Sequence, residues 1–560
     1  MSAINEQQGN NWWAQGDTPV QAHSHVSYRV DALSALLTMC RHFLMAQKYI
    51  YVAGWGMTPT MRLVRGKDHR TGPDGSPEQE ALLAELRAQG LQEAEITFWC
   101  SHDLTVQAVL GYMVSKGVQV KALIWDSSEK FSHCDPKAAC EQLTQVSVTC
   151  ILDDSSHGLL HHPVESLHQK IAIVDGTHAF VGGIDVLIEL NGDFDRWDTP
   201  FHHFFSPLRR NEADNNPHPW HDAHAIIEGA AVGDVELNFR QRWNDVVERH
   251  HWDTQLLVPW HPLTAPLESN SLVQVARTIP AHTYSFTPKE GIQGIAQLYA
   301  HALSNAHHFI YLENQYFWLH AYTGIDIPNL GTDSPDMERN IRELGAALQR
   351  GATVAIVLPD NPNVGRAFTD AGLTRLRQEA PEAAAQGRIQ AFCLATSAEI
   401  GGEEHYRPIY VHAKVAIVDD LWSTVGSANL NNRGMRDDTE MNVATLNAEL
   451  ARDLRLMLWA EHLGLMSEDD PLTVARQPGH QHQAQSVDER SAVRLQQLQE
   501  TLGDPLAGLR LMVERAQDNL LRYKAKQPLL GHLLPYLTAE EATQQGLNFR
   551  EGQGWVEVPE

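Results

Sequence analysis

Long apolar segments and a leader-like N-terminus are both missing from this 560-residue sequence. No stretch of about 18 uninterrupted apolar residues occurs, so we expect no transmembrane helix. Residues 1–17 have neither a basic n-region nor an apolar h-region, so a Sec-type signal peptide is not expected. The sequence therefore predicts a cytoplasmic protein, or one exported without a Sec signal as a secreted effector, that contacts membranes only peripherally.

Positive charge is also scarce. The chain has 43 Lys and Arg residues against 70 Asp and Glu, which gives a formal net charge of −27. Only 11 of the basic residues are lysines. A field of this sign repels the phosphates of nucleic acid and anionic lipid surfaces. We expect no nucleic-acid partner, although a small local positive site is compatible with the total.

Cysteine and metal-ligand patterns are weak. The six cysteines include no C-x-x-C pair and no zinc-like spacing, which favours reduced, mostly buried thiols over a disulfide framework. His161-His162 and His202-His203 look like pairs of metal ligands, but a chain with 30 histidines contains such pairs by chance. The sequence predicts no metal site and no required cofactor. Calcium binding stays open, without a motif that indicates it.

One short pattern, H-x-K-x4-D, occurs twice. The first copy comprises His168, Lys170 and Asp175, and the second, 244 residues further on (412 − 168), comprises His412, Lys414 and Asp419. In each copy the apolar, β-branched run after the lysine predicts a short buried strand. His and Lys, two residues apart, then project from the same side of the sheet. Each Asp falls where its strand must end, so we interpret it as structural. Two copies by chance have a probability on the order of 0.001.

Other elements recur in the same order. A predicted helix and strand at residues 30–47 and 49–52 are matched by those at 291–305 and 309–312, and the pair at 103–116 and 118–126 by that at 336–350 and 352–360. A further strand is predicted around residues 96–100. An internal duplication is the economical interpretation, and two unrelated α/β domains are the alternative.

The predicted fold class is therefore α/β. We expect two duplicated α/β/α sandwich halves with mixed, mostly parallel sheets, related by pseudo-twofold symmetry, with an active site at their interface. Composition suggests an N-terminal extension (1–27), a first half (28–252), a proline-rich linker (253–286), a second half (287–465) and a mostly helical C-terminal appendage (466–560). Trp12 and Trp13 would either enter a membrane interface or pack onto the core.

Residues downstream of the two motifs point to a family. Gly426, Ser427 and Asn429 follow the second motif, and Gly183 and Asp185 stand at the corresponding offsets after the first. The paired motifs resemble those of the phospholipase D superfamily. Five further segments are similar to the catalytic core of eukaryotic-type phospholipases D over roughly residues 28–465, namely 219–224, 239–243, 313–317, 409–412 and 458–462. No segment resembles the C2 or PX/PH membrane-targeting domains of those enzymes.

The resemblance implies a phosphoryl-transfer mechanism without a metal. Lys170 and Lys414 would stabilise the non-bridging phosphate oxygens. One histidine, assigned as His168 because the family usually uses its first copy, would attack phosphorus to form a phosphohistidine, and His412 would protonate the departing alcohol. Gly183, Asp185, Ser427 and Asn429 would support the substrate phosphate.

Each imidazole also needs a carboxylate that sets its orientation and tautomer. Glu440 stands 28 residues after His412, at the acidic position that has this role in the superfamily. Asp198, 30 residues after His168, is the candidate for the first copy. A solvated surface acid is the alternative interpretation of both residues.

The implied function is a phospholipase D that hydrolyses glycerophospholipids to phosphatidic acid and a free head-group alcohol, with transphosphatidylation when a primary alcohol replaces water. The expected partners are a phospholipid at a membrane surface and a water or alcohol acceptor. Three alternatives remain: a phosphatidyltransferase of the phospholipid-synthase type, a phosphodiesterase or nuclease of the same superfamily, and a non-catalytic lipid- or phosphate-binding scaffold.

Overall fold

The structure is a computed structural model of the chain. It describes residues 12–127, 133–157, 165–190, 193–209, 216–261, 267, 269, 271–320, 333–362, 364–468, 470, 472, 489–550 and 553–557. His161-His162 therefore lies outside the described residues.

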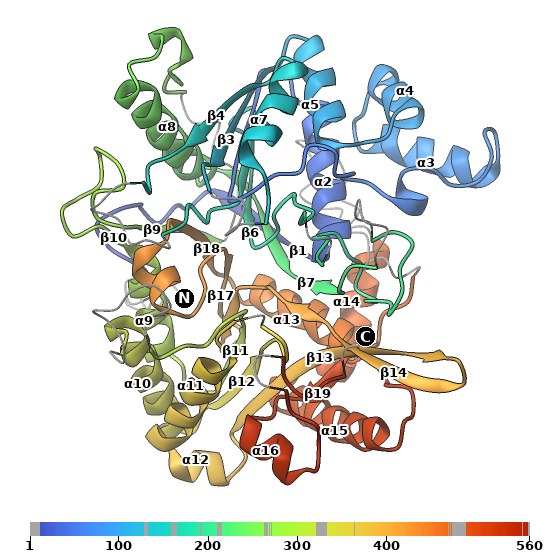
Figure 1. The fold of residues 1–560 in the computed structure, drawn as a ribbon, viewed down its shortest axis with the longest axis vertical. Helices are drawn as coiled ribbons and strands as arrows, with labels where there is room; N and C mark the ends of the chain where they lie inside the picture. The colour runs from blue at the N-terminus through green and yellow to red at the C-terminus, as the bar shows by residue number, and fades with distance from the viewer. Residues whose placement is uncertain are drawn as a thin grey trace.

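The first half is a seven-stranded sheet with helices on its faces (Figure 1). The strand order is β1-β8-β6-β5-β2-β3-β4. Its strands are β1 (Ser24–Val30), β2 (Tyr49–Gly54), β3 (Gln119–Trp125), β4 (Thr149–Asp153), β5 (Ile171–Val174), β6 (His178–Gly182) and β8 (Ala223–Gly229). Its helices are α2 (Asp31–Met45), α3 (Pro77–Ala88), α4 (Glu93–Ser101), α5 (Val106–Ser115), α7 (Pro136–Gln145) and α8 (Val232–Arg249).

The second half repeats this arrangement around a larger sheet of order β10-β9-β18-β17-β16-β11-β12-β13-β14. Its strands are β9 (Leu272–Ile279), β10 (Ile292–Gln293), β11 (Phe309–Glu313), β12 (Thr353–Val357), β13 (Ile389–Ile400), β14 (Glu403–Pro408), β16 (Val415–Val418), β17 (Trp422–Gly426) and β18 (Glu440–Leu446). Its helices are α9 (Gly294–Ser304), α10 (Pro335–Gln349), α11 (Arg366–Glu379), α12 (Pro381–Ala385) and α13 (Ala448–His462).

The two sheets have the same topology, which confirms the predicted duplication. From β1 to β4 the strand order of the first half matches the order from β9 to β13 of the second. Both sheets are mixed, but antiparallel pairings outnumber parallel ones: only β2–β3–β4 and β11–β12–β13 run parallel. The reason is local, because tight turns after β5 and β16 send the chain straight back as the antiparallel strands β6 and β17.

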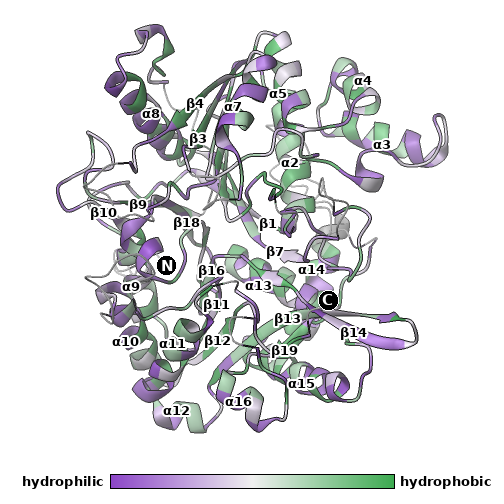
Figure 2. Ribbon diagram, viewed as in Figure 1, coloured by the Kyte–Doolittle hydropathy of each residue, from purple (hydrophilic) through white to green (hydrophobic). Residues whose placement is uncertain are grey.

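The halves share one central hydrophobic core. The side chains of α8 and α13 lie on the inner faces of their sheets, where Phe239 stacks on Tyr51 at 4.9 Å and Trp459 packs edge-on against Tyr311 at 5.6 Å. Next to these helices the two sheets touch directly, with Tyr28 Oη 2.9 Å from Ser423 Oγ. Helices α2 and α5 cover the outer face of the first sheet and α9 to α11 that of the second. Figure 2 shows the apolar residues concentrated along the strands between these layers.

The structure corrects two predictions about local structure and decides between the two alternatives for Trp12 and Trp13. The predicted linker contains β9, which pairs with β18 inside the second sheet. The strand was not predicted because proline-rich segments flank its short apolar run. Residues 96–100 are part of helix α4 rather than a strand, since their position in the helix turns Trp99 into the core. Trp12 and Trp13 are buried against the second half, and Trp12 stacks on Trp422 at 6.5 Å, so these tryptophans pack onto the core.

The C-terminal region packs onto the second half. It comprises α14 (Glu489–Leu502), α15 (Pro505–Lys524), β19 (Leu533–Pro535) and α16 (Ala539–Gln544). Strand β19 adds to the second sheet by pairing with β13. Further along, the backbone amides of Trp555 and Val556 donate to Oδ2 of Asp360 at 2.9 and 2.8 Å. These contacts extend the second sheet and its core.

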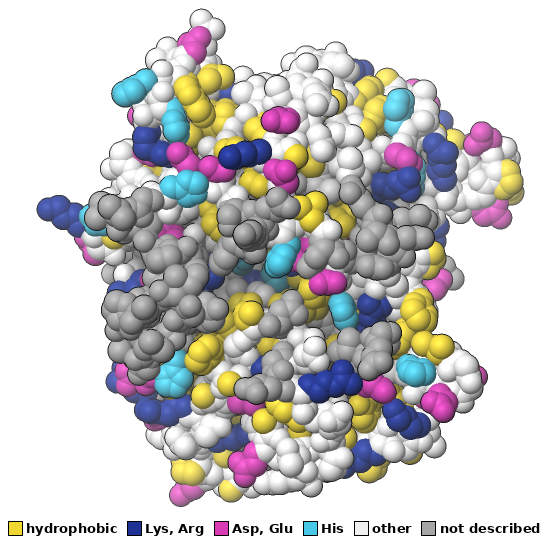
Figure 3. Space-filling view, viewed as in Figure 1, with side chains coloured by type: hydrophobic (Ala, Val, Ile, Leu, Met, Phe, Trp, Pro, Cys, Tyr) yellow, Lys and Arg dark blue, Asp and Glu magenta, His cyan; other side chains and the backbone are white. Residues whose placement is uncertain are grey.

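Among the described residues, no helix combines the length and apolar character needed to span a bilayer. Acidic and basic side chains are interspersed over the described part of the face in Figure 3.

Candidate active site

The two halves are joined where the two histidine motifs begin. Strands β7 (Trp220–His221) and β15 (Tyr410–Val411), one from each half, form a small parallel sheet, and the amide of His412 donates to the carbonyl of His221 at 2.8 Å. On the other side, the amide of His168 donates to the carbonyl of Thr439 at 2.9 Å. Each motif histidine is therefore fastened by its backbone to the opposite half.

The carboxylates that orient the two imidazoles follow the same crossed pattern. Nδ1 of His168 lies 3.0 Å from both carboxylate oxygens of Glu440, which belongs to the second half. Nδ1 of His412 lies 2.7 Å from Oδ2 of Asp222, which belongs to the first half. Because a carboxylate accepts the Nδ1 proton, Nε2 of each neutral ring has a free lone pair. The structure thus pairs each histidine with an acid from the other copy.

Asp198, predicted as the orienting acid of the first copy, has a different place. Its carboxylate accepts hydrogen bonds from Arg209 Nη1 at 3.0 and 3.1 Å and from the amide of Trp220 at 2.9 Å, and it lies 3.2 Å from Nδ1 of His202. The prediction was wrong because it assumed a similar sequence offset in both copies. The acid is Asp222, which stands in one of the segments that resemble phospholipases D, and that segment was the available signal.

The two motif lysines are buried and differently supported. Lys170 Nζ donates to the carbonyl of His168 at 2.7 Å and pairs with Asp185 Oδ2 at 3.2 Å. Lys414 Nζ donates to the carbonyl of His412, and Oε1 of Gln315 lies 3.4 Å away. Gln315 thus supports the second lysine as Asp185 supports the first. It was not among the predicted site residues, although it lies in one of the resembling segments.

The residues downstream of the motifs support the orienting acids and lysines. Ser427 Oγ donates to Glu440 Oε2 at 2.5 Å, and Asn429 Nδ2 donates to Gln315 Oε1 at 3.2 Å. At the position matching Ser427, Gly183 leaves room for the other acid, because a Cβ there would lie 2.0 Å from Oδ1 of Asp222. This close approach explains why the first copy has glycine where the second has serine.

Asp175 and Asp419 hold strand ends. The carboxylate of Asp175 accepts from the amides of residues 47–49, at 2.7 to 2.8 Å, just before and at the start of β2. Asp419 accepts in the same way from the amides of residues 307–309 before β11. Both residues have positive φ (53° and 54°) and begin the turns that reverse the chain. Neither contacts the histidines, so their place agrees with a structural interpretation.

Burial and positive charge set the protonation of the site. Burial lowers the pKa of His168 well below its usual value, and the charges of Lys170 and Lys414 lower it further. Burial and then Lys414 also lower the pKa of His412 well below its usual value, with a contribution from Lys170. Each lysine therefore acts on both rings, as expected when the two motifs share one site. Burial raises the pKa of Asp222 to about 6, so this acid is ionised at neutral pH.

Aromatic side chains line the His412 side. Trp220 stacks on Tyr410 at 4.7 Å and packs against the His412 ring at 4.7 Å. The guanidinium of Arg196 lies 3.8 Å above the Trp220 ring and pairs with Glu189 at 2.6 Å. This wall restricts the orientation of His412 and adds a third cation near the two lysines.

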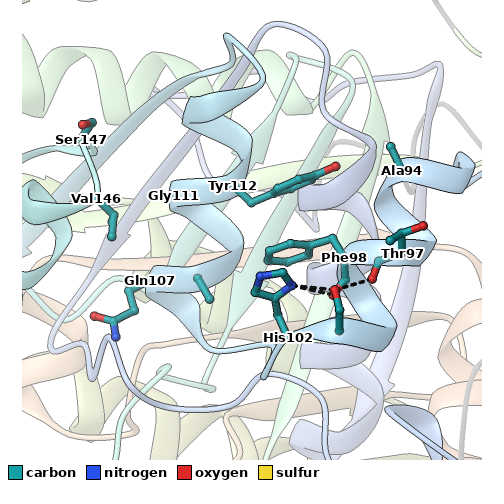
Figure 4. Close-up of a pocket in the computed structure, with 11 residues that line it drawn as sticks. Ala94, Thr97, Phe98, His102, Gln107, Gly111, Tyr112, Val146 and Ser147 are labelled. Atoms are coloured by element: carbon teal, nitrogen blue, oxygen red, sulfur yellow. Dashed lines mark hydrogen bonds between the residues drawn. The ribbon is translucent and has the colours of Figure 1, made fainter.

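A surface hollow lies elsewhere and contains no motif residue. It measures about 580 Å³ and is bordered by α4 and α5 of the first half, where Phe98 stacks on Tyr112 at 4.1 Å (Figure 4). The reactive groups at the interface of the halves are not part of it.

The fold and this site define a class: a duplicated α/β protein whose two His–Lys pairs meet with crossed acids at one interface. A family model described as "Phospholipase D" matches residues 42–329, and one described as "Cardiolipin synthase, PLD-like domain" matches residues 299–460. The chain belongs to the phospholipase D family.

The chain is also similar to curated relatives. The chain is 26% identical over 544 residues to phospholipase D alpha 1 of Carica papaya, with 76% of this chain and 63% of the relative covered. It is 26% identical over 547 residues to phospholipase D beta 2 of Arabidopsis thaliana, with coverages of 76% and 56%. The chain thus spans less than two thirds of the length of these relatives. A phosphatidylserine synthase of Haemophilus influenzae aligns at 12% identity with a TM-score of 0.45, over 90% of this chain and 99% of that chain.

Proposed function

We propose that the protein is a phospholipase D that hydrolyses the distal phosphodiester of glycerophospholipids to phosphatidic acid and a free head-group alcohol. The observation that carries the proposal is the crossed pair of dyads, His168 with Glu440 and His412 with Asp222. Two imidazoles with free Nε2 atoms, and a lysine beside each, supply a nucleophile, an acid and the charge that a phosphodiester requires.

The first chemical step forms a phosphohistidine. Nε2 of His168 attacks phosphorus and the P–O bond to the head group breaks, while His412 gives the leaving oxygen its Nε2 proton. His412 acquires this proton when substrate binds, because the phosphodiester anion offsets the lysine charges that lower its pKa in the empty site. The ionised carboxylate of Asp222, which accepts the Nδ1 proton of His412, stabilises the resulting imidazolium.

The second step returns the enzyme to its starting state. His412, now neutral, takes a proton from water, the water oxygen attacks phosphorus, and the P–N bond to His168 breaks. A primary alcohol in place of water gives a new phosphodiester, which is transphosphatidylation. Lys170 and Lys414 face the non-bridging oxygens in both steps, and no step requires a metal. The choice of His168 as nucleophile follows the family.

We also propose peripheral contact with a lipid surface around the site. Leu190, Phe205 and Val364 are exposed by 54%, 58% and 45%. Leu190 directly follows Glu189, the partner of Arg196 above Trp220. Val364 is two residues after Pro362, whose carbonyl accepts from Tyr410 Oη. Leu190 and Val364, which are close in sequence to partners of the aromatic wall, suit contact with acyl chains.

The proposal is tested with vesicles of phosphatidylcholine, phosphatidylethanolamine and phosphatidylglycerol, with head-group release as the readout and with ethanol added to detect exchange. We expect release by the wild type and none by His168→Asn or His412→Asn. A matched control is His203→Asn, a half-exposed histidine that should release head groups at the wild-type rate. Cleavage of plasmid DNA without lipid turnover would instead assign the site to a nuclease.

Trapping of the intermediate separates an enzyme from a binding scaffold. Rapid quenching with a denaturant at mildly alkaline pH during turnover, followed by mass spectrometry at a pH that preserves phosphohistidine, should place a phosphatidyl adduct on a peptide that contains His168. An adduct on the His412 peptide would instead identify His412 as the nucleophile and His168 as the general acid. Absence of any adduct together with absence of head-group release would contradict the proposed function.

A further inference from the structure

Four buried, metal-ligating side chains converge behind the Asp222–His412 dyad. They are Asp31 at the start of α2, His202 in the loop after Asp198, His221 in β7 and Glu461 near the end of α13. All four are at most 1% exposed, and one donor atom of each lies within 4.8 Å of the others. The first three come from the first half and Glu461 from the second.

The distances suit a small tetrahedral ion. His202 Nε2 lies 3.1 Å from Glu461 Oε1 and 3.5 Å from Asp31 Oδ2. His221 Nδ1 lies 2.7 Å from Glu461 Oε1 and 3.2 Å from Asp31 Oδ1. Nitrogen and oxygen ligands about 2.0 Å from a tetrahedral zinc ion are separated by about 3.3 Å. The four contacts, from 2.7 to 3.5 Å, lie on both sides of that separation, so small shifts of the side chains would bring the donors to such a site.

Two oxygens of the cluster lack a hydrogen-bond partner among the described residues. Within the part of the chain that the structure describes, the carboxylate oxygens Asp31 Oδ2 and Glu461 Oε2 are buried and accept no hydrogen bond, while His221 Nδ1 faces the other oxygen of each carboxylate. Buried polar atoms of this kind are rare, because each costs about 1–3 kcal/mol when it has no partner. Two such oxygens in one cluster indicate a ligand that the side chains alone do not supply.

The second ring nitrogen of each imidazole also faces a carboxylate. Nδ1 of His202 lies 3.2 Å from Asp198 Oδ2, and Nε2 of His221 lies 2.8 Å from Glu313 Oε2. Metal-ligating histidines almost always donate their second ring N–H to such a group, which fixes the tautomer and aims the lone pair at the ion. Asp198 and Glu313 have this relation to the two rings. Asp198, which does not orient a motif histidine, would then fix the tautomer of His202.

We propose that Asp31, His202, His221 and Glu461 bind one divalent transition-metal ion of the zinc type. Two imidazoles among the four donors favour zinc over calcium, which prefers six to eight oxygen ligands. Four protein ligands leave no open position, which is typical of a structural rather than a catalytic site. The ion would not take part in the phosphoryl transfer.

The location gives the ion a positioning role. Asp31 Oδ1 accepts from the amide of Asp222 at 3.1 Å, and the carbonyl of His221 accepts from the amide of His412 at 2.8 Å. An ion held by Asp31 and His221 is therefore connected to both members of the dyad through these two hydrogen bonds. Because Glu461 belongs to the second half, the ion also fastens the two halves together at the site.

The test is metal analysis of the full-length protein, expressed without a polyhistidine tag in zinc-supplemented medium. We expect about one equivalent of zinc per chain in the wild type and in His203→Asn, the adjacent histidine outside the cluster. His202→Asn and Glu461→Gln should each lose it. Unfolding and refolding with a chelator should lower the Tm by about 5 °C or more, and added zinc should restore it.

Cobalt provides a measurement that does not depend on the variants. Wild-type protein refolded with Co²⁺ should show the intense visible absorption of tetrahedral cobalt, and zinc should remove that signal. If the wild type neither retains zinc nor incorporates Co²⁺, the proposal is wrong. Protons on the two imidazole rings would then hold the carboxylates together without a metal. Zinc that persists in both cluster variants would overturn it as well, because the metal would then be bound elsewhere. Neither result depends on the lipid activity.

Discussion

The carboxylate of Glu440, from the second half of the chain, lies 3.0 Å from Nδ1 of His168, 272 residues earlier in the sequence. Asp222 and His412 repeat this relation in the opposite direction across 190 residues. Neither half alone therefore contains a complete His–acid dyad. A change that loosens the contact between the halves will disturb both dyads together.

The first prediction concerns the orienting acid. Glu440→Gln replaces the carboxyl group whose oxygens face Nδ1 of His168 with an amide that can also donate a hydrogen bond, so the ring loses its defined tautomer. We expect kcat to fall by about 10²–10⁴-fold, the range seen when the acid of a His–acid pair is neutralised. The measurement is head-group release, with Glu449→Gln on the exposed start of α13 as the matched control. A fall of less than threefold for Glu440→Gln would contradict the dyad.

A second prediction follows from the difference between Gly183 and Ser427. Gly183→Ala adds a Cβ 2.0 Å from Asp222 Oδ1 and must displace that acid. A displacement of about 1 Å at a reactive group costs about 10²-fold in rate. Ser427→Ala only removes a hydrogen bond to Glu440 and should cost about tenfold. Equal rates for the two variants would show that the close approach to Asp222 is not limiting.

The pH dependence should reflect Lys414. Burial lowers the pKa of this lysine to about 7; Lys170 lowers it as well, while Asp222, Glu440 and Asp185 raise it. The free enzyme therefore loses the ammonium charge as the pH rises through about 7, and kcat/KM should fall above that value. In the complex the phosphate anion raises this pKa, so kcat should fall only at higher pH.

Lys414→Arg is the control for this assignment. Arginine stays charged across the whole range, so the alkaline decline of kcat/KM should disappear even if the variant is slower. A decline that survives in Lys414→Arg would assign the ionisation to another group.

The fourth prediction concerns stability. Trp12 is 6% exposed and stacks on Trp422 in the core of the second half. Trp12→Ala should reduce the free energy of unfolding by about 3–5 kcal/mol, the usual cost of truncating a buried tryptophan. Trp260→Ala, at a side chain 64% exposed, should change it by less than about 0.5 kcal/mol. Denaturant titration provides both values, and similar losses for the two variants would contradict the packing.

Local pattern predicted much of the fold. The two His–Lys strands, the helices that became α2, α9 and α10, and the order of the repeated elements all follow from hydrophobic period and turn residues. The errors have physical causes. The run at 96–100 suits either a strand or a buried helix, and only its packing against α5 decides for helix. Strand β9 was not predicted from the sequence because prolines dominate the composition of the segments that flank it.

The sequence by itself determined the duplicated scaffold and the His, Lys and strand-end Asp positions, because these depend on spacings of two to five residues along one strand. Only the tertiary structure decided which acid serves which histidine, that Gln315 supports Lys414, and that Asp31, His202, His221 and Glu461 converge. Those contacts join segments from different parts of the chain, and no local periodicity records how the two halves dock.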